Sequence, residues 1–394
     1  IGSGGLITTL LEMCFADNNL GAKINLNAFT EKDLVKILFS ENIGLVLQAE
    51  QDASFEKAFE SLEYFKIGSV SSADSLDIKC NEVSWSLDIK KYRKIWFETS
   101  YLFDQKQTAN DKAKERFENF DKQPLRFKFP THFTGKKPII DASKPRPKAA
   151  IIREKGSNSE REMANAMYLA GFDVKDIHMT DLISGRETLE DVQFIGAVGG
   201  FSNSDVLGSA KGWAGAFLYN EKANLALKNF FNRNDTLSVG ICNGCQLFME
   251  LEVINPEHKT HGKMKHNDSH KHESGFTSVI IQENNSVMLK TLSGSTLGVW
   301  ISHGEGKFSL PHNENEYHIV AKYNYKGYPA NPNGSDFNTA MMCDKTGRHL
   351  VMMPHIERSI FSWNWANYPQ REQKDEVSPW MEAFVNARKW LVNK

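Results

Sequence analysis

The sequence has few cysteines, no long hydrophobic run and no excess of charge of one sign. Five scattered cysteines among 394 residues, an odd number, do not form a disulfide framework, which favours a reducing compartment. No apolar run approaches the roughly 20 residues that span a bilayer. No signal-peptide pattern is found in the first residues. A cytoplasmic location is therefore expected.

The charge balance excludes some classes of partner. Lysine and arginine number 47 and aspartate and glutamate 49, so the net charge is −2 and no strongly basic surface is expected. Neither nucleic acid nor a membrane is predicted as a partner. The composition, 40% hydrophobic and 24% charged, is that of a soluble globular protein, and the length allows two or three domains. No internal repeat is visible.

The beginning of the chain lacks a methionine and enters an apolar helical pattern at once, with Leu6, Leu10 and Leu11 on one face. A chain that begins inside a structural element is typical of a fragment. We therefore expect the sequence to be part of a larger polypeptide.

Residues 1–100 have the pattern of a mixed α/β unit. Helices are predicted over 6–16 and 31–39, an apolar strand over 43–50, and an amphipathic helix over 54–65 that ends before Gly68. Residues 101–147 become polar and charged and then rich in proline, which favours a helix followed by a linker. A domain boundary is predicted near residue 148.

Residues 148–394 begin with alternating strands and helices. An apolar strand runs to Gly156, and a helix follows between a cap among residues 157–159 and a stop at Gly171. Strands "VKDIHMT" and "FIGAVGG", a helical stretch over 209–230 and the strand "TLSVGI" come next. This alternation predicts an α/β fold with a mostly parallel sheet and helices on both faces, with ligands at the carboxyl ends of the strands.

The stretch "LSVGICNGCQLFMEL" contains a CxxC pair, Cys242 and Cys245. A strand, Gly240, Cys242, Gly244 and a helix follow one another, as in the nucleophile elbow G-x-S-x-G with sulfur in place of oxygen. The N–H groups at a helix N-terminus can stabilise a thiolate or an oxyanion there. This pattern favours Cys242 as a nucleophile and places Cys245 in the packing of the helix.

Three other readings of the pair remain open at this point. A redox couple also places CxxC at a helix start, although no thioredoxin-like tryptophan or proline context is present. A zinc site would combine both cysteines with His258 and His261, at nearly zinc-finger spacing, but would require them to leave the strand-to-helix turn. Both cysteines could also be core residues. We interpret the His-rich segment 258–272 as a solvated or interdomain stretch and infer no metal from it.

A base and an orienting acid are found near the C-terminus, in "RHLVMMPHIERS". An apolar strand over 349–353 and Pro354 precede His355 and Glu357, whose side chains point the same way on an extended chain. His355 then serves a thiol nucleophile as general base while the Glu357 carboxylate holds the imidazole.

These two motifs resemble the signature of class I glutamine amidotransferases, G-x-C-x-G-x-Q with a later P-H-x-E. Further segments are similar to the phosphoribosylformylglycinamidine synthases of the large, fused type: "GGFSNSDVLGSAKGWA", "SHGEGKF", "GYPANPNGS" and "SPWMEAFVNARKWL". The N-terminal stretches "GSGGLITTLLEMCFA" and "IWFETSYLFDQ" are similar to the end of the second synthetase half. The resemblance covers nearly the whole chain.

The resemblance implies three parts. Residues 1–100 would be the C-terminal part of an aminoimidazole-ribonucleotide-synthetase-like domain, 101–147 a helix and linker, and 148–394 a flavodoxin-like glutaminase domain. This domain would hydrolyse glutamine through a cysteine thioester and supply ammonia for ATP-dependent conversion of formylglycinamide ribonucleotide to formylglycinamidine ribonucleotide in purine biosynthesis. The implied enzyme is a carbon–nitrogen ligase. No cofactor is implied for the glutaminase domain, whereas ATP and Mg²⁺ are implied for the full-length synthetase, whose N-terminal domains would be its partners.

The resemblance also implies roles for single residues. Cys242 would be the nucleophile, His355 the acid and base, and Glu357 its orienting partner. Backbone N–H groups of Gly200, Phe201 and Asn243 would form the oxyanion hole, and Gln246 would bind glutamine. His303 and Glu305 of "SHGEG" are candidates for a catalytic or ligand role, with a structural turn as the alternative.

The chain departs from this family at Asn203 and Ser204, where relatives more often carry an aromatic residue and glycine, so the oxyanion loop has its own sequence here. A related hydrolase with a cysteine elbow on the same fold, without a glutamyl thioester, is the remaining alternative, beside the zinc and redox readings.

Overall fold

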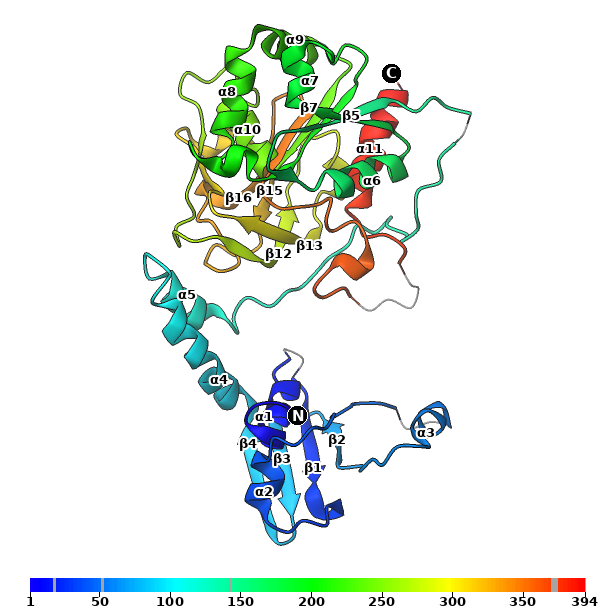
Figure 1. Cartoon of the computed structure of the whole chain (residues 1–394), viewed down its shortest axis with the longest axis vertical. Coiled ribbons are helices and arrows are strands. Elements are labelled where there is room, and N and C mark those ends of the chain that lie inside the picture. The colour runs from blue at the N-terminus through cyan, green and yellow to red at the C-terminus, as the bar shows by residue number, and fades with distance from the viewer. Residues whose placement is uncertain (17–18, 51–52, 142, 370–374, 394) are drawn as a thin grey trace. The chain divides into compact units, whose positions relative to one another are not determined.

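The computed structural model describes residues 1–394 apart from 17–18, 51–52, 142, 370–374 and 394 (Figure 1). The chain divides into two compact units, residues 1–106 and residues 107–394. None of the helices in the described part of the chain combines the length and the apolar character needed to cross a membrane.

The first unit is a small four-stranded sheet with helices, in the strand order β2-β1-β3-β4. β1 and β3 are parallel and the other neighbours are antiparallel. Leu6 and Leu10 of α1 are buried with Leu76 and Ile78 of β3 in one core. The elements are α1 (Gly5–Cys14), β1 (Gly21–Asn25), α2 (Leu34–Phe39), α3 (Ala53–Phe59), β2 (Gly68–Ser71), β3 (Ser75–Cys80), β4 (Val83–Asp88) and α4 (Ile89–Asp104).

Two predictions for this unit are wrong in detail. Residues 43–50 do not form a strand: β1 is already paired on both edges by β2 and β3, and Ile43 and Leu45 lie exposed within the unit. The predicted helix 54–65 ends at Phe59 in α3. Gly68 starts β2 rather than closing a helix, because a Cβ at this position would overlap the Lys23 carbonyl oxygen of β1.

The second unit is built on a nine-stranded sheet in the order β13-β12-β15-β16-β17-β10-β8-β5-β7. From β17 to β7 all neighbours are parallel, and from β13 to β17 they are antiparallel. The strands are β5 (Lys148–Arg153), β7 (Asp173–His178), β8 (Phe194–Ala197), β10 (Leu237–Ile241), β12 (Glu273–Ile281), β13 (Thr296–His303), β15 (His318–Tyr323), β16 (Thr339–Cys343) and β17 (His349–Met352). Short pairs are formed by β6 (Ser157–Asn158) with β9 (Gly199–Gly200) and by β11 (Lys263–Lys265) with β14 (Lys307–Ser309).

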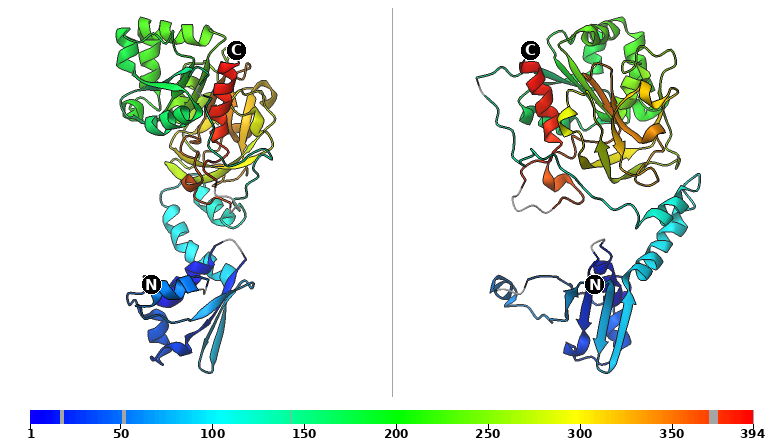
Figure 2. Two further views of the ribbon diagram at one scale, coloured as in Figure 1. Left: turned by 90° about the vertical axis from the view of Figure 1, so that its right-hand side faces the viewer. Right: turned by 180° about the vertical axis from the view of Figure 1, so that it is seen from behind.

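Helices cover both faces of this sheet, which confirms the predicted α/β fold (Figure 2). One face carries α6 (Glu160–Ala170) and α11 (Met381–Val392); the other carries α7 (Met179–Ser184), α8 (Lys211–Tyr219), α9 (Glu221–Asn232) and α10 (Asn243–Glu250). α6 follows Ser159 and ends at Gly171, whose φ of 97° favours glycine, as the sequence predicts. β10 is buried at every position, as expected for a strand covered on both faces.

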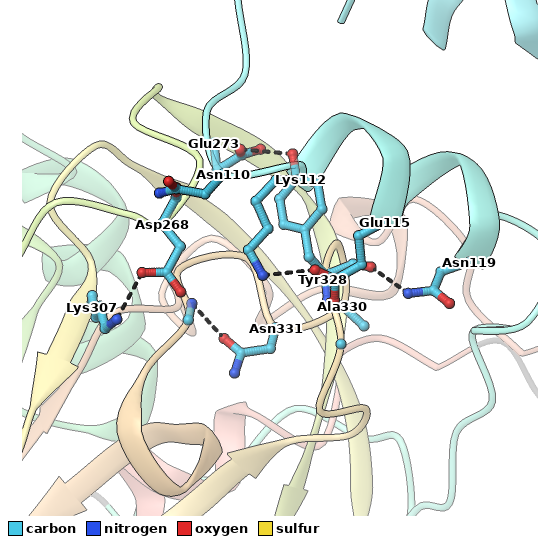
Figure 3. Close-up of polar contacts among 12 residues, drawn as sticks. Asn110, Lys112, Glu115, Asn119, Asp268, Glu273, Lys307, Tyr328, Ala330 and Asn331 are labelled. Atoms are coloured by element: carbon cyan, nitrogen blue, oxygen red, sulfur yellow. Dashed lines mark hydrogen bonds and ion pairs between the residues drawn. The ribbon is translucent and has the colours of Figure 1, made fainter. Parts of the chain in front are cut away.

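The polar segment that starts the second unit is fastened to it by α5 (Lys112–Asn119), as Figure 3 shows. The Glu115 carboxylate accepts the Tyr328 N–H over 2.7 Å, and the Asn119 side-chain amide donates to the Tyr328 carbonyl oxygen over 2.9 Å. Arg116 forms an ion pair of 3.1 Å with Glu273, and the Tyr328 hydroxyl donates to the same carboxylate over 2.8 Å. We call these contacts of Glu115, Arg116 and Asn119 the α5 anchor.

Residues after α5 continue along the same unit. Lys128 and Thr296 exchange two backbone hydrogen bonds of 2.8 and 2.9 Å, which add a short bridge beside β13. Much of the segment predicted as a linker is therefore packed against the second unit. Glu273 lies opposite His303 in the β12–β13 register, so the α5 anchor reaches a strand pair that ends at the candidate site.

Candidate active site

Cys242 lies in the sharp turn between β10 and α10. Its φ of 54° and ψ of −106° form a backbone conformation that residues with a side chain rarely adopt. The Cys242 N–H donates to the Met352 carbonyl oxygen over 2.8 Å, which ties the turn to β17. A Cβ on Gly240 would lie 2.5 Å from the Gly244 carbonyl oxygen, so strand and helix approach closely only because both residues are glycine. The turn thus has the geometry of an elbow.

His355 and Glu357 follow β17, the strand beside β10. Ile241 pairs with Met352 in the parallel register, so the chain leaves both strands at the same sheet edge. The His355 N–H donates to the Trp300 carbonyl oxygen over 2.8 Å, which fixes its backbone. His355 Nδ1 lies 2.6 Å from Glu357 Oε1, and both side chains are at most 2% exposed. The pair is a buried, charge-assisted hydrogen bond.

The electrostatics of this pair favour a protonated imidazole. Burial alone would lower the pKa of His355, but the Glu357 carboxylate and the neighbouring Cys242 raise it to about 10. His355 Nε2 is buried and makes no other hydrogen bond among the described residues. With Nδ1 bonded to Glu357, Nε2 is the ring atom left to exchange a proton with the sulfur or a substrate.

Gly199 shows how closely the thiol and the imidazole approach each other. A Cβ at this position would lie 2.9 Å from His355 Cε1 and 3.4 Å from Cys242 Cβ. One missing methyl group therefore separates the backbone of β9 from both side chains. On another side, Cys242 Sγ lies 3.5 Å from the Ser302 carbonyl oxygen, an acceptor for the thiol proton.

The predicted oxyanion donors differ in their geometry. Asn243 is the first residue of α10, where an N–H has no acceptor within the helix, and it follows Cys242 directly. Gly200 lines the pocket that contains Cys242. The Phe201 N–H donates to the Gly156 carbonyl oxygen over 2.9 Å, so it does not point into the pocket as an oxyanion donor would. For Phe201 the expectation does not fit this conformation, because β6 and β9 pair at this point.

The loop after Phe201 is held in an unusual backbone conformation. Asn203, Ser204 and Asp205 have φ values of 52°, 56° and 49°, all in the left-handed region. Ser204 stands where relatives more often carry glycine, which adopts that region without strain. The Asn243 side chain supports this loop by accepting the Ser202 N–H over 3.2 Å.

Gln246 lies one turn into α10 and lines the same pocket. Its side-chain oxygen accepts the Asn243 amide over 3.0 Å, and its nitrogen donates to the Glu305 carbonyl oxygen over 2.7 Å. The amide is therefore held in a fixed orientation at the pocket wall, with one acceptor site and one N–H outside these two bonds.

His303 is buried at the end of β13 and also lines the pocket. Burial, together with nearby His355 and His272, lowers its pKa to about 3, so the ring is neutral. Its Nδ1 lies 3.2 Å from the Asn267 side-chain oxygen, which also accepts the Gly306 N–H. An oxygen cannot donate, so Nδ1 carries the proton and Nε2 is the unprotonated nitrogen.

Glu305 supports the site mainly through its backbone. Its carbonyl oxygen accepts from Gln246, whereas its carboxylate accepts the Ser209 N–H over 3.4 Å and lies 3.9 Å from His266. The SHGEG segment therefore joins the pocket wall to the loop after Phe201.

Cys245 differs from Cys242 in its surroundings. It is fully buried in α10, and burial followed by the proximity of Cys242 raises its pKa well above the usual value for a thiol. All five cysteines are free thiols. The prediction that Cys245 belongs to the packing of the helix is confirmed.

The His-rich segment is not a single cluster. His258 packs on His312 and Tyr317, with ring centroids 4.6 and 5.1 Å away. His272 contacts the site instead: its Nε2 lies 3.0 Å from the Ser302 hydroxyl, and its ring lies 5.8 Å from that of Phe201. In the part of the chain that the structure describes, no three His, Cys, Asp or Glu side chains gather as a metal site would require.

Several residues at the site were not singled out from the sequence. Asp205, Ser302 and Arg358 line the pocket, and Asn267 fixes the ring of His303. Arg358 directly follows the P-H-x-E motif, so its position was a usable signal. The others become visible only when the strands are paired, because they lie on loops far from either motif.

Known proteins resemble this chain over its whole length. It is 37% identical over 426 residues to the Arabidopsis thaliana protein named probable phosphoribosylformylglycinamidine synthase, chloroplastic/mitochondrial, and the match covers 99% of this chain and 30% of that relative. It is 35% identical over 432 residues to the Homo sapiens protein named phosphoribosylformylglycinamidine synthase, covering 100% of this chain and 32% of that relative. The predicted resemblance is confirmed, and the chain spans less than a third of the length of these relatives.

A solved structure supports the fold. The structure of PurLQS from Thermotoga maritima matches 63% of this chain and 100% of that chain, with a TM-score of 0.50 and 22% identity. Residues 146–391, more than half of the chain, match the family described as CobB/CobQ-like glutamine amidotransferase domain. The chain therefore belongs to this family of glutamine amidotransferases.

Proposed function

We propose that this chain hydrolyses the side-chain amide of glutamine through a thioester on Cys242. The observation that carries the proposal is the elbow thiol beside a buried imidazole braced by Glu357, in a chain of the glutamine amidotransferase family. Cys242 is proposed as the nucleophile, His355 as the acid and base, and Glu357 as its orienting partner.

The first half of the reaction cleaves the amide. The Cys242 sulfur attacks the amide carbon, a carbon–sulfur bond forms, and the carbonyl oxygen becomes an oxyanion next to the Asn243 N–H. The His355 imidazolium gives its Nε2 proton to the nitrogen, the carbon–nitrogen bond breaks, and ammonia leaves. The imidazole is then neutral and able to act as a base.

The second half releases glutamate. His355 removes a proton from water, the hydroxide attacks the thioester carbon, and the carbon–sulfur bond breaks to restore the Cys242 thiolate and the imidazolium. The buried Glu357 carboxylate stabilises the imidazolium in both halves. Acyl transfer of this kind needs a nucleophile, a proton carrier and an oxyanion hole, so we propose no cofactor for it.

The names of the relatives suggest where the ammonia goes. We propose that it serves the ATP-dependent conversion of formylglycinamide ribonucleotide to formylglycinamidine ribonucleotide, with ATP and Mg²⁺ bound by the larger part of such proteins. That larger part, to which residues 1–100 would contribute a synthetase-like piece, is the proposed partner of the amidotransferase domain. A cytoplasmic site of action remains part of this proposal.

Release of ammonia and glutamate from glutamine tests the proposal, with Cys242→Ala compared against the matched change Cys245→Ala. We expect Cys242→Ala to reduce release to background and Cys245→Ala to retain most of it, since Cys245 is a packing residue. Equal loss in both variants, stoichiometric zinc, or a reversible Cys242–Cys245 disulfide that tracks activity would favour the other readings of the cysteine pair.

A further inference from the structure

The pocket at Cys242 carries two oppositely charged side chains that the reaction steps above do not use. Asp205 and Arg358 line it together with Cys242 and His355. Asp205 comes from the loop after β9, and Arg358 from the segment after β17, so opposite charges reach one pocket from two different parts of the fold.

Asp205 has polar partners but no cation among them. Its carboxylate accepts from the Ser209 hydroxyl at 3.1 Å, the Ala210 N–H at 3.4 Å and the Asn243 amide at 3.5 Å, and all three are uncharged. Burial raises the pKa of the Asp205 carboxyl, and nearby Glu305 adds to this effect. A partly buried carboxylate beside a second one is stabilised by an incoming ammonium group.

Arg358 keeps hydrogen-bonding capacity toward the pocket. Its Nη2 donates to the Asn158 side-chain oxygen over 2.6 Å, and its Nε lies 3.5 Å from Glu162 and 4.0 Å from Glu357. The guanidinium group has five N–H donors in a planar fork, more than these contacts use, and its side chain is 31% exposed. Such a fork matches a carboxylate.

We propose that the pocket recognises glutamine as a zwitterion, with Asp205 binding its α-ammonium group and Arg358 its α-carboxylate. This inference rests on the proposed function and adds the source of its specificity. The two charges hold the amino-acid end, and the side-chain amide is left to reach the Cys242 sulfur. Neutral amides lack both groups, so they leave Asp205 and Arg358 unpaired and bind poorly.

The test compares two thiol reagents on the whole chain. Diazo-oxo-norleucine carries the zwitterionic α-carbon of glutamine, whereas iodoacetamide is neutral and reports only thiol reactivity. The second-order labelling rate of Cys242 is measured with each reagent in Asp205→Asn and Arg358→Gln. Asp176→Asn and Arg153→Gln are the matched controls, because these residues form a partly exposed ion pair that does not line the pocket.

We expect each pocket variant to lower the diazo-oxo-norleucine rate, relative to iodoacetamide, by roughly 10- to 100-fold, the range for losing a hydrogen bond to a charged group. The controls should label as the parent does. Parent-like relative rates in both pocket variants would overturn the inference while leaving the proposed function intact. Failure of the parent to react with diazo-oxo-norleucine, while it reacts with iodoacetamide, would instead count against the proposed function.

A second measurement needs no variant. Glutamine, glutaramate, which lacks the α-ammonium group, and glutamine methyl ester, which lacks the α-carboxylate, are compared as protectants of the parent chain against diazo-oxo-norleucine. We expect both analogues to protect at least tenfold less well than glutamine. Equal protection by all three would show that the pocket does not read the zwitterion.

Discussion

At the scale of single residues, the proposed chemistry depends on the buried pair of His355 and Glu357. Both side chains are almost fully withdrawn from water, so each would be costly to ionise without the other. The 2.6 Å hydrogen bond offsets that cost and fixes which ring nitrogen faces the thiol. The pair should therefore govern activity and stability together.

Replacing Glu357 by glutamine tests this coupling. We expect glutamine hydrolysis to fall by roughly 10²- to 10⁴-fold, the usual weight of positioned proton transfer, because burial alone lowers the pKa of His355. In the parent chain that pKa is raised to about 10, above the value near 6.5 of an unfolded chain. The stability that the pair contributes is thus fully present below pH 6.5 and lost as the pH rises toward 10.

Chemical unfolding at several pH values measures that contribution as the difference between the parent and Glu357→Gln. The difference should be largest at or below pH 6.5 and shrink toward pH 10. A difference that grows with pH would mean that the imidazole is neutral in the folded state.

Gly199 allows a second test at this scale. In Gly199→Ala the new Cβ would lie 2.9 Å from His355 Cε1, so we expect at least a tenfold loss of activity for about 1–3 kcal/mol of stability. Gly275→Ala is the matched control, because a Cβ there meets nothing within 4 Å. Activity assays and thermal unfolding of both variants decide the matter. Equal activities would show that the thiol and the imidazole have room to separate.

The catalytic residues could be chosen from the sequence because the elbow and the P-H-x-E stretch each carry their chemistry within a few residues. Ser302 and Asn267 could not, since they act through a backbone oxygen and a tautomer that depend on strand pairing. Phe201 was misjudged for a similar reason: its N–H is engaged by Gly156 in a two-residue strand pair that periodicity does not detect.

At the scale of elements, the α5 anchor is the contact that sequence patterns left out. A charged, proline-rich segment is typical of a linker, yet Glu115 and Asn119 hydrogen-bond the backbone of Tyr328. Helix, strand and cap positions around β10 and α6 were predictable because burial and capping are local. Residues 43–50 were not, because an apolar run becomes a strand only where a sheet edge is open.

Changing Glu115 to alanine tests the α5 anchor. We expect the second unit to lose about 1–3 kcal/mol of stability, because the variant leaves the Tyr328 N–H without its carboxylate acceptor. Glu118→Ala on the same helix is the control: Glu118 makes only an exposed pair with Lys114 at 3.9 Å, so less than about 0.5 kcal/mol is expected. Denaturant unfolding measures both, and faster amide exchange over 327–331 in Glu115→Ala alone would localise the effect. Equal stabilities would show that α5 rests on the unit without supporting it.

At the scale of the whole molecule, the fold predicts sensitivity to acid. Burial lowers the pKa of His303 to about 3 and that of His349 to about 4, while both titrate near 6.5 in an unfolded chain. The unfolded state therefore binds more protons, and stability is lost as the pH falls from 6.5 toward 3, by on the order of a few kcal/mol. Unfolding free energies across this range should decrease less steeply in His349→Gln. An identical slope would exclude His349 as a cause.

The two compact units, residues 1–106 and 107–394, make the organisation of the chain visible without assigning the first unit a function. The interpretation of residues 1–100 as part of a synthetase-like domain stays a prediction. The relatives, of which this chain spans about 30%, show that a similar sequence occurs within much longer proteins.

The central claim is that Cys242 carries the glutamyl group, and trapping that group tests it most directly. The chain is mixed with glutamine, quenched in acid during turnover, digested and read by tandem mass spectrometry. A glutamyl adduct on Cys242, absent in Cys242→Ala and unaffected by Cys245→Ala, is the predicted result. Ammonia released without any adduct on Cys242, or an adduct on another residue, would contradict the account.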